Sequence, residues 1–275
     1  MTDETAQVRA QYGAVAAAYR TSQVHASGPD LDRMIELLDP HGDEVAIDLG
    51  TGAGHAAVRL AAHVARVEAI DLVPAMLGQA SLLAEERGRT NIGFHACDVR
   101  ALPFGDRSFD AAVTRVSAHH WADVPAGIAE AARVLRPGAR IVVIDTVAPA
   151  DPALDTFINA VELLRDPSHG RDATMEEWGR ILEAAGFRVD VAEVAPIELE
   201  AADWFARSRT EPWREGAARR LLGEASRTAR ETFEISGDGT RFSLLRGILA
   251  GTRGEGVSPM SVSRGGTGTT TGPAR

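Results

Sequence analysis

The chain has 275 residues, of which 44% are hydrophobic and 25% charged, and its net charge at pH 7 is −10. This length suits one large globular domain or one domain with a sub-domain, and the acidic charge argues against binding to nucleic acid or to anionic membrane surfaces. All 29 basic residues other than histidine are arginines, which excludes P-loop and pyridoxal phosphate enzymes because both need a lysine.

Two further features concern the compartment. The first ten residues contain acids and no apolar run, and no stretch of about 18 apolar residues occurs anywhere in the chain. The only cysteine is Cys97, so an intrachain disulfide is excluded. We therefore expect a cytoplasmic protein without a membrane span, and we leave a homodimer open.

The first half of the chain predicts helices followed by alternating strands and helices. Residues 4–38 predict one or two helices whose apolar anchors are Tyr12, Tyr19, Leu31, Met34 and Leu37. Strands are expected at 45–50, 66–73, 91–99, 109–118 and 139–147, and helices at 55–64, 74–88 and 124–135, with the last helix closed by Pro137 and Gly138. The strands are continuous apolar runs, as in parallel strands covered on both faces, so we predict an α/β fold: a doubly wound, Rossmann-like, mostly parallel seven-stranded sheet.

The second half is richer in helices. Helices are expected at 151–164, 175–187 and about 201–233, and strands at 188–199 and 241–251, so the last helices form an insertion that could cap the sheet. Residues 252–275 are rich in Gly, Thr and Ser and are expected to be disordered. The resulting domain prediction is N-terminal entry or lid helices (1–40), a ligand-binding core (41–150), the rest of the sheet with a helical cap (151–252) and a tail (253–275).

The stretch VAIDLGTGAGHAA, residues 45–57, joins a strand to a helix through a glycine turn. The dinucleotide fingerprint G-x-G-x-x-G fails here, because its last glycine would fall on His55. Asp48 ends the strand, and a carboxylate there would repel a pyrophosphate but suits a cationic amino group. The helix N-terminus that follows can receive a carboxylate, so the turn predicts a ligand with an amino acid moiety.

Two more acids end the next strands. Asp71 lies about 20 residues further on, where an acid in doubly wound folds binds ribose hydroxyls. Asp98 ends the third strand, where a side chain can reach an adenine amino group. An amino acid, a ribose and an adenine together describe S-adenosylmethionine. The alternative is that Asp48 and Asp71 merely cap the helices that follow them.

Four motifs carry a resemblance to a known family. VAIDLGTGAG, VEAIDLVPAML, ACDVRALPFGDRSFDAAV and EAARVLRPGARIVVID occur in an order and spacing that resemble class I S-adenosylmethionine-dependent methyltransferases over about residues 10–252. The small-molecule subgroup with ubiquinone and menaquinone biosynthesis methyltransferases is the most similar. The resemblance implies an enzyme that moves a methyl group from S-adenosylmethionine to oxygen, carbon or nitrogen of a small, aromatic or lipophilic metabolite, leaving S-adenosylhomocysteine.

The resemblance also assigns cofactor contacts along the chain. It implies that the methionine end is held by Asp48, Gly50, Thr51, Gly52 and Gly54, the ribose by Asp71, and the adenine by Leu72, Met76, Asp98 and Val99 with Cys97 as a small hydrophobe beside them. It further implies that Arg115 and Val116 line the cofactor and that Tyr19 closes over the methionine end. For Met76 a place in the ordinary core is the alternative.

The segment SAHHW, residues 117–121, follows the fourth strand at the edge where ligands bind in such folds. Histidine is the usual base for removing a proton from an acceptor. In an extended segment successive side chains point oppositely, so we expect only one of His119 and His120 to face the cofactor, with a slight preference for His120. The alternative is that both are structural, and His25 is a further pocket candidate. No metal site is expected, because adjacent side chains diverge and no acid cluster accompanies them.

Aromatic residues in the cap raise a question about the acceptor. Trp178, Trp204 and Trp213 fit core packing, and the alternative is that Trp204, Phe205 and Trp213 line an apolar acceptor pocket. Two other functions stay open: a non-methylating reaction such as a cyclisation on the same fold, and a protein methyltransferase or binding protein.

Overall fold

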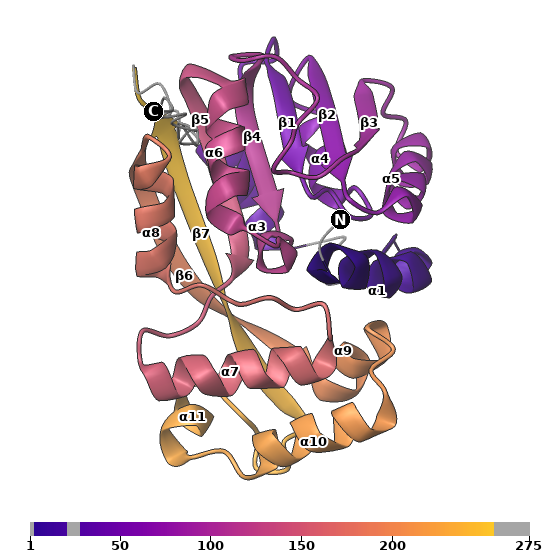
Figure 1. Ribbon diagram of the computed structural model, residues 1–275, viewed down its shortest axis with the longest axis vertical. Coiled ribbons are helices and arrows are strands. Elements are labelled where there is room, and N and C mark those ends of the chain that lie inside the picture. Colours follow the sequence, from indigo (N-terminus) through magenta and orange to yellow (C-terminus); the bar gives the residue numbers. More distant parts are fainter. Residues whose placement is uncertain (1–2, 21–27, 256–275) are drawn as a thin grey trace, which may run out of the picture.

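The computed structural model describes residues 3–20 and 28–255, and its centre is one seven-stranded sheet (Figure 1). The strand order is β3-β2-β1-β4-β5-β7-β6, with parallel pairing from β3 through β5 and antiparallel pairing of β7 with both neighbours. The strands are β1 (Val45–Leu49), β2 (Arg66–Asp71), β3 (Ile92–Ala96), β4 (Phe109–Arg115), β5 (Leu135–Thr146), β6 (Phe187–Glu200) and β7 (Arg241–Arg253). The predicted doubly wound, mostly parallel sheet is confirmed.

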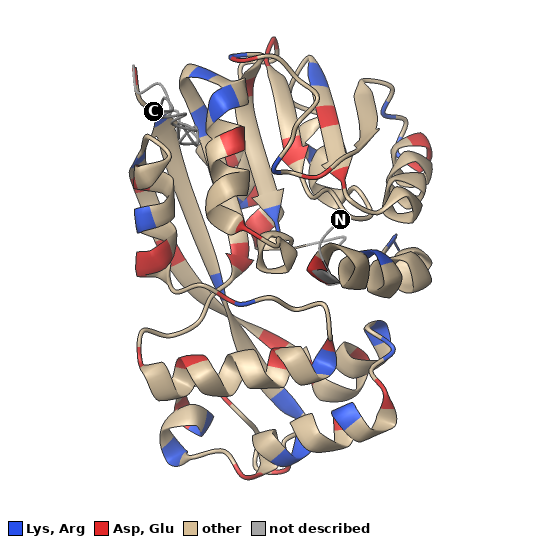
Figure 2. Cartoon of the chain, in the orientation of Figure 1, with Lys and Arg blue, Asp and Glu red and all other residues tan. Residues whose placement is uncertain are grey.

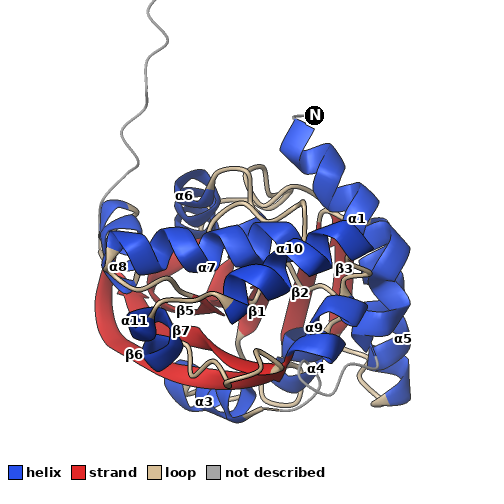
Figure 3. Cartoon of the chain, turned by 90° about the horizontal axis from the view of Figure 1, so that it is seen from below, coloured by secondary structure: helices blue, strands red, loops and turns tan. Residues whose placement is uncertain are grey.

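Helices cover both faces of this sheet, which is why its central strands are apolar on both sides (Figure 3). Helices α3 (Pro29–Leu38) and α4 (His55–Leu60) pack on one face, where Met34 and Leu60 are fully buried. Helices α6 (Val124–Val134) and α8 (Met175–Ala184) pack on the other, where Ile128 and Trp178 belong to the core. Helix α5 (Pro74–Glu86) packs against β2, β3 and α4.

Helix α1 (Asp3–Arg20) lies across the lower ends of β1 to β3 in Figure 1, against α5. Its own small core joins Val8, Tyr12 and Tyr19 to Val73 and Met76 at the start of α5. A hydrogen bond from Gln11 Nε2 to the Ser208 carbonyl (2.8 Å) ties the outer side of α1 to the segment after α9 (Ala201–Arg207). The helix is therefore held from two sides over the carboxyl ends of the strands.

Strands β6 and β7 run on past the rest of the sheet into a helical lobe in the lower half of Figure 1. This lobe consists of α7 (Pro152–Arg165), α9, α10 (Pro212–Gly223) and α11 (Arg227–Thr232). The predicted insertion of helices between the last two strands is thus confirmed. Figure 2 shows acidic and basic segments interspersed on α10 and α11.

Several predicted boundaries differ from the structure. The helix expected at 55–64 ends at Leu60, and β5 begins at Leu135, so that Pro137 and Gly138 lie inside a strand. The strand tolerates them because pairing between β4 and β5 shifts register there and Gly138 has a positive φ of 82°. Strand β7 continues to Arg253, past the expected start of the tail. The rest of that tail, from residue 256, and His25 lie outside the described residues.

Among the helices that the structure describes, none is both long enough and apolar enough to cross a membrane.

Candidate active site

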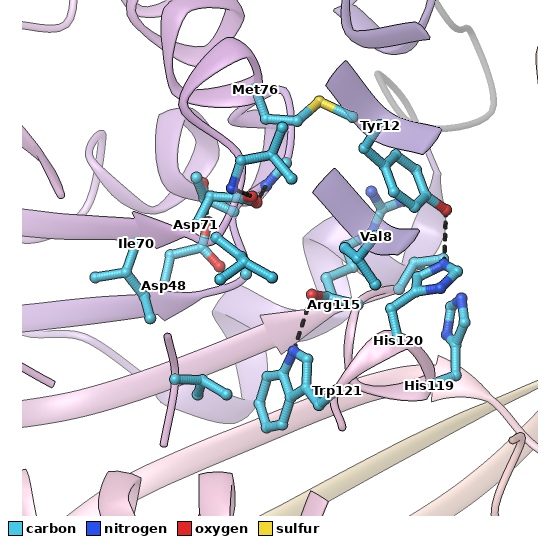
Figure 4. Close-up of a pocket in the computed structure, with 18 of the residues that line it drawn as sticks. Val8, Tyr12, Asp48, Ile70, Asp71, Met76, Arg115, His119, His120 and Trp121 are labelled. Carbon is cyan, nitrogen blue, oxygen red and sulfur yellow. Dashed lines mark hydrogen bonds between the residues drawn. The ribbon is translucent and has the colours of Figure 1, made fainter. Parts of the chain in front are cut away.

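One cavity lies at the carboxyl ends of β1, β2 and β4 and is closed from outside by α1 (Figure 4). Its wall contains both predicted histidines, His119 and His120. It also contains all but one of the predicted cofactor residues: Tyr19, Asp48, Gly50, Thr51, Gly52, Asp71, Leu72, Met76, Cys97, Asp98, Val99, Arg115 and Val116. The fold thus brings residues from five separate segments to one place.

The exception is Gly54, which lies outside the cavity wall among the described residues. It is the N-cap of α4 with φ 90°, and a Cβ atom there would lie 2.7 Å from Ala80 Cβ and 2.9 Å from Ala80 Cα. Glycine at position 54 therefore allows α4 to approach α5 closely, whereas glycine at position 50 makes room for Ser117 in the cavity wall. At Gly50 (φ 73°) a Cβ would lie 1.9 Å from Ser117 Oγ.

Two buried carboxyl groups, Asp48 and Asp71, meet at this turn. Asp48 is 1% exposed and its Oδ2 accepts a hydrogen bond from the Thr51 hydroxyl at 2.6 Å. Asp71 accepts the backbone N–H groups of Gly52 and Val73, each at 2.8 Å. Burial raises the pKa of Asp48 to about 7 and that of Asp71 to about 6.

Neither acid occupies a helix cap position, because the N-cap of α4 is Gly54 and that of α5 is Val73. Asp48 nevertheless accepts a hydrogen bond from the backbone N–H of Ala57 in the first turn of α4, so the capping alternative stays open for this acid. Both face a cavity while their charged forms are disfavoured by burial, an arrangement that a cationic or hydroxyl-bearing ligand would relieve.

Next to the two acids, the cavity wall has apolar side chains and one further carboxylate. Met76 is buried, lines the cavity and also packs in the α1 core, so its contact with the adenine stays a prediction. Asp98 is paired with Arg100 (Oδ2 to guanidinium nitrogen 2.7 Å), and the hydrogen bonds from Arg100 hold the pKa of Asp98 below its usual value. Burial raises the pKa of Cys97 to about 11, which keeps it a neutral thiol.

Strand β4 ends in a bend that shapes the centre of the cavity. Val116 has φ 52°, a left-handed conformation that a β-branched residue rarely adopts, and its N–H donates to the Ile144 carbonyl at 2.7 Å. The bend turns Ser117 toward the Gly50 turn. The Arg115 guanidinium pairs with Asp30 of α3 (2.8 and 3.1 Å), which ties α3 to the cavity wall.

The histidines lie on a 3₁₀ turn, η1 (Ala118–His120), rather than on an extended segment. Both rings line the cavity with their centroids 4.1 Å apart, so the prediction that only one faces it is wrong. The turn is closed by a hydrogen bond from the backbone N–H of His120 to the Ser117 carbonyl oxygen (3.0 Å). A turn brings adjacent side chains to the same side, which the alternation rule for extended chain does not cover.

His119 is bound to one carboxylate through two groups. Its Nδ1 lies 2.5 Å from Asp145 Oδ1, and its backbone N–H donates to Asp145 Oδ2 at 3.1 Å. Burial alone would lower the pKa of His119, but the charge of Asp145 outweighs it and raises that pKa to about 9. At neutral pH His119 therefore carries a positive charge next to His120.

His120 is held by different partners. Its Nε2 lies 2.6 Å from the Tyr12 hydroxyl oxygen, and its Nδ1 lies 3.1 Å from the Ser168 carbonyl oxygen (Figure 4). The Tyr12 hydroxyl also lies 3.0 Å from Asp166 Oδ2. Burial first and the charge of His119 second lower the pKa of His120 to about 4, so this imidazole is neutral at pH 7.

Sequence reasoning missed Tyr12, Arg165 and Asp166 as site residues. Tyr12 was predicted as an apolar anchor, yet it lies two helical turns from Tyr19 on the same face of α1, with ring centroids 5.4 Å apart. That spacing was the signal that could have placed it beside the predicted Tyr19. Arg165 and Asp166 end α7, and no sequence signal links them to this edge of the sheet.

The predicted core packing is confirmed for two of the three tryptophans. Trp178 lies in the core of the sheet, and Trp204 and Phe205 lie in the core of the helical lobe with Phe233 and Phe242, so the alternative of an acceptor pocket is wrong for Trp204 and Phe205. Trp213 is 62% exposed, so core packing is wrong for this residue. Among the described residues no group of three or more histidine, cysteine or acidic side chains could hold a metal ion.

The fold is that of a methyltransferase, as comparisons with known proteins show. Residues 47–143 match the family model described as a methyltransferase domain. The chain is 35% identical over 236 residues to the uncharacterized methyltransferase YcgJ of Bacillus subtilis, covering 86% of this chain and 91% of the relative. The chain therefore belongs to the class I S-adenosylmethionine-dependent methyltransferases.

A solved structure of the same relative and one further protein are also similar to the chain. The crystal structure of the YcgJ protein superposes with a TM-score of 0.80 at 33% identity, over 83% of this chain and 99% of the other. A demethylmenaquinone methyltransferase of Deinococcus radiodurans is 36% identical over 112 residues, which is 40% of this chain and 46% of that protein.

Proposed function

We propose that this enzyme binds S-adenosylmethionine in the cavity and methylates a small, aromatic or lipophilic metabolite. The observation that carries the proposal is the continuity of the cavity, which runs from the buried acids Asp48 and Asp71 to the histidine pair under the cover of α1. One continuous cavity would thus contain both a cofactor site and a proton-accepting site.

The residues present fit the cofactor. Asp48 and the backbone of the glycine turn would hold the amino acid end, since a buried carboxyl group favours an ammonium partner over water. Asp71, already fixed by two backbone N–H groups, would accept the ribose hydroxyls. Met76 and Val99 would enclose the adenine, and the neutral Cys97 thiol fits beside them.

A second cavity supports a lipophilic acceptor. It lies between α6 and α8 and shares His119, Trp121 and Ala122 with the first cavity. Its wall includes the apolar side chains of Ile181 and Ala184. We infer that the reacting part of the acceptor lies at the histidine pair and that an apolar extension lies between these two helices.

In the proposed reaction the cofactor supplies the methyl group, and the protein positions the acceptor and removes its proton. When bound, S-adenosylmethionine supplies an electrophilic methyl group on its sulfonium. The chain would exclude water with α1, hold the acceptor in line and take up the acceptor's proton. Of the histidine pair, the neutral His120 is the proposed proton-accepting residue, and the charged His119 lies beside it.

The test has two stages. Calorimetry with S-adenosylmethionine and S-adenosylhomocysteine measures cofactor binding, and a protein that binds neither would refute the proposal. Tritiated S-adenosylmethionine is then incubated with demethylmenaquinone and, separately, with the small-molecule fraction of a bacterial extract. Tritium in an organic-soluble product supports the proposal, whereas tritium in protein would favour a protein methyltransferase. A converted acceptor without tritium would favour the non-methylating alternative.

A further inference from the structure

We propose that Tyr12, His120 and Asp166 form a proton relay in which the Tyr12 hydroxyl oxygen receives the proton of the methyl acceptor. The inference rests on the proposed function, because it specifies how the same cavity handles the acceptor's proton. Tyr12 is the catalytic residue, Asp166 positions it, and the proton ends on His120.

The hydrogen count at the three residues shows a place for one added proton. The Ser168 carbonyl oxygen only accepts hydrogen bonds, so the hydrogen of neutral His120 is assigned to Nδ1 and the lone pair to Nε2. Tyr12 then has one hydrogen for two acceptors, His120 Nε2 at 2.6 Å and Asp166 Oδ2 at 3.0 Å; its hydroxyl also hydrogen-bonds the Tyr19 side chain, and the Tyr19 hydroxyl is assigned as the donor there. In this state one of the two contacts lacks a hydrogen.

Adding a proton completes the set. A protonated His120 donates from Nε2 to the Tyr12 oxygen, which frees the Tyr12 hydrogen for Asp166 Oδ2. The other oxygen of Asp166 is already occupied by the backbone N–H and hydroxyl of Ser168, at 2.8 and 2.6 Å. The His120–Tyr12 and Tyr12–Asp166 contacts then each hold one hydrogen, and two hydrogen bonds connect the imidazolium to the Asp166 carboxylate. The hydrogen bonds are thus better satisfied after proton uptake, which partly offsets the burial and the His119 charge that lower the pKa of His120.

Access to the imidazole explains why the proton passes through Tyr12. Both nitrogens of His120 have partners, the Ser168 carbonyl on one side and Tyr12 on the other. Tyr12 itself lines the cavity from α1, whereas Asp166 does not. An acceptor in the cavity therefore meets the phenol oxygen before it can exchange a proton with the ring.

The second histidine has a different role. His119 already holds a proton because Asp145 stabilises it, so it has no proton-accepting capacity at neutral pH. The groups that face His120 are Tyr12 from α1, His119 from η1, Asp145 from β5, and Asp166, Ser168 and His169 from the segment after α7. Of these, His119 keeps His120 neutral in the resting state, and Asp166 stabilises the charge that forms during turnover.

The step balances for an acceptor with an exchangeable proton, such as a hydroxyl, an amine or an acidic carbon. The bond from the acceptor atom to the methyl carbon forms as the carbon–sulfur bond breaks, and the bonding pair of that bond stays on sulfur. The acceptor's proton moves to the Tyr12 oxygen, and the Tyr12 proton moves to His120 Nε2. His120 releases its proton to solvent after the product leaves.

The first test does not depend on an acceptor. In protein labelled with ¹⁵N-histidine and saturated with S-adenosylhomocysteine, nuclear magnetic resonance reports the protonation of each ring nitrogen. The relay predicts that His120 is neutral and protonated at Nδ1 between about pH 6 and pH 8, while His119 is doubly protonated. A His120 ring that is doubly protonated in this range has no lone pair for Tyr12 and would overturn the proposal.

The second test uses Tyr12→Phe, which keeps the ring contacts with Tyr19 and His120 and removes only the hydroxyl. We expect kcat to fall about 10²-fold or more, with the cofactor Kd and the acceptor KM changed less than about threefold. The kcat of His120→Gln should fall by a similar factor. The kcat of the double variant should be no lower than that of either single variant, because the two residues act as a unit.

His169→Gln is the matched control, a buried histidine of the same cluster that does not line the cavity and hydrogen-bonds Asn159 (3.0 Å). We expect its kcat to stay within about threefold of the wild-type value. If the wild type transfers the methyl group and Tyr12→Phe transfers it equally fast, the relay is refuted and the proposed function stands. If the wild type binds no cofactor, both are refuted together.

Discussion

Replacing Asp48 by asparagine tests the cofactor site most sharply. The substitution keeps the shape of the side chain and an oxygen that can accept the Thr51 hydroxyl, which lies 2.6 Å from Asp48 Oδ2. It removes only the charge. Removing one partner of a buried ion pair costs about 3–5 kcal/mol, so we expect S-adenosylmethionine to bind about 10²- to 10⁴-fold more weakly.

The pKa of Asp48 adds a pH dependence with a defined sign. Burial raises this pKa from 3.8 to about 7, so a bound ammonium group competes with a proton over the neutral range. Wild-type affinity should fall about tenfold for each pH unit below about pH 7, and Asp48→Asn should lose that slope. Calorimetry between about pH 5 and pH 8 measures both effects, with Asp190→Asn on the outer strand β6 as the matched loss of one negative charge.

Stability should move in the opposite direction. Asp48 has a higher pKa in the folded than in the unfolded state, so its ionised form destabilises the fold. The loss in unfolding free energy is therefore greatest above about pH 7, where the group is ionised in both states. Asp48→Asn should therefore raise the Tm at about pH 8 while it weakens cofactor binding. Unchanged affinity in Asp48→Asn, or a weakened affinity accompanied by a lower Tm, would refute this account of the buried acid.

Three further predictions concern other parts of the molecule. In Asp145→Asn, the charge on His119 is lost and the pKa of His120 should rise from about 4 toward its ordinary value, visible as a higher ¹⁵N titration midpoint; an unmoved midpoint would contradict the electrostatic coupling. Gly54→Ala should lower the unfolding free energy by about 2–4 kcal/mol in denaturant titrations, because its Cβ meets α5 at 2.7 Å, whereas Gly52→Ala, with positive φ but open space, should cost only about 1–2 kcal/mol. Equal losses would show that backbone strain alone matters at both sites. Ala184→Trp, which fills the cavity between α6 and α8, should raise the KM for a lipophilic acceptor about tenfold or more without changing the cofactor Kd; unaltered acceptor kinetics would place the acceptor elsewhere.

The parts of the site that local sequence signals specify could be predicted from the sequence. A glycine turn after a buried strand fixes the place of Asp48, and the ends of parallel strands necessarily meet at one sheet edge, which places Asp71 and Asp98. The strand-and-helix alternation predicted the sheet for the same reason. These inferences need only the period of the hydrophobic residues and the residue types at the strand ends.

The rest depended on tertiary packing that no local pattern contains. Tyr12 and Asp166 are 154 residues apart in the chain and meet only because α1 lies between the sheet and the helical lobe. The histidine pair was predicted by type and place, but its 3₁₀ turn follows from the strained bend at Val116 rather than from the letters SAHHW. Trp204 packs in the core of the lobe, where Arg165 Cζ lies 4.8 Å from the centroid of its ring.

Product analysis by mass spectrometry tests the central claim most directly. The purified enzyme is incubated with S-adenosylmethionine carrying a trideuterated methyl group, first with demethylmenaquinone and then with the small-molecule fraction of a bacterial extract. The account predicts a small organic product that has exchanged one hydrogen for one trideuteromethyl group, together with an equal amount of S-adenosylhomocysteine. Tight cofactor binding without any trideuteromethylated small molecule would contradict it.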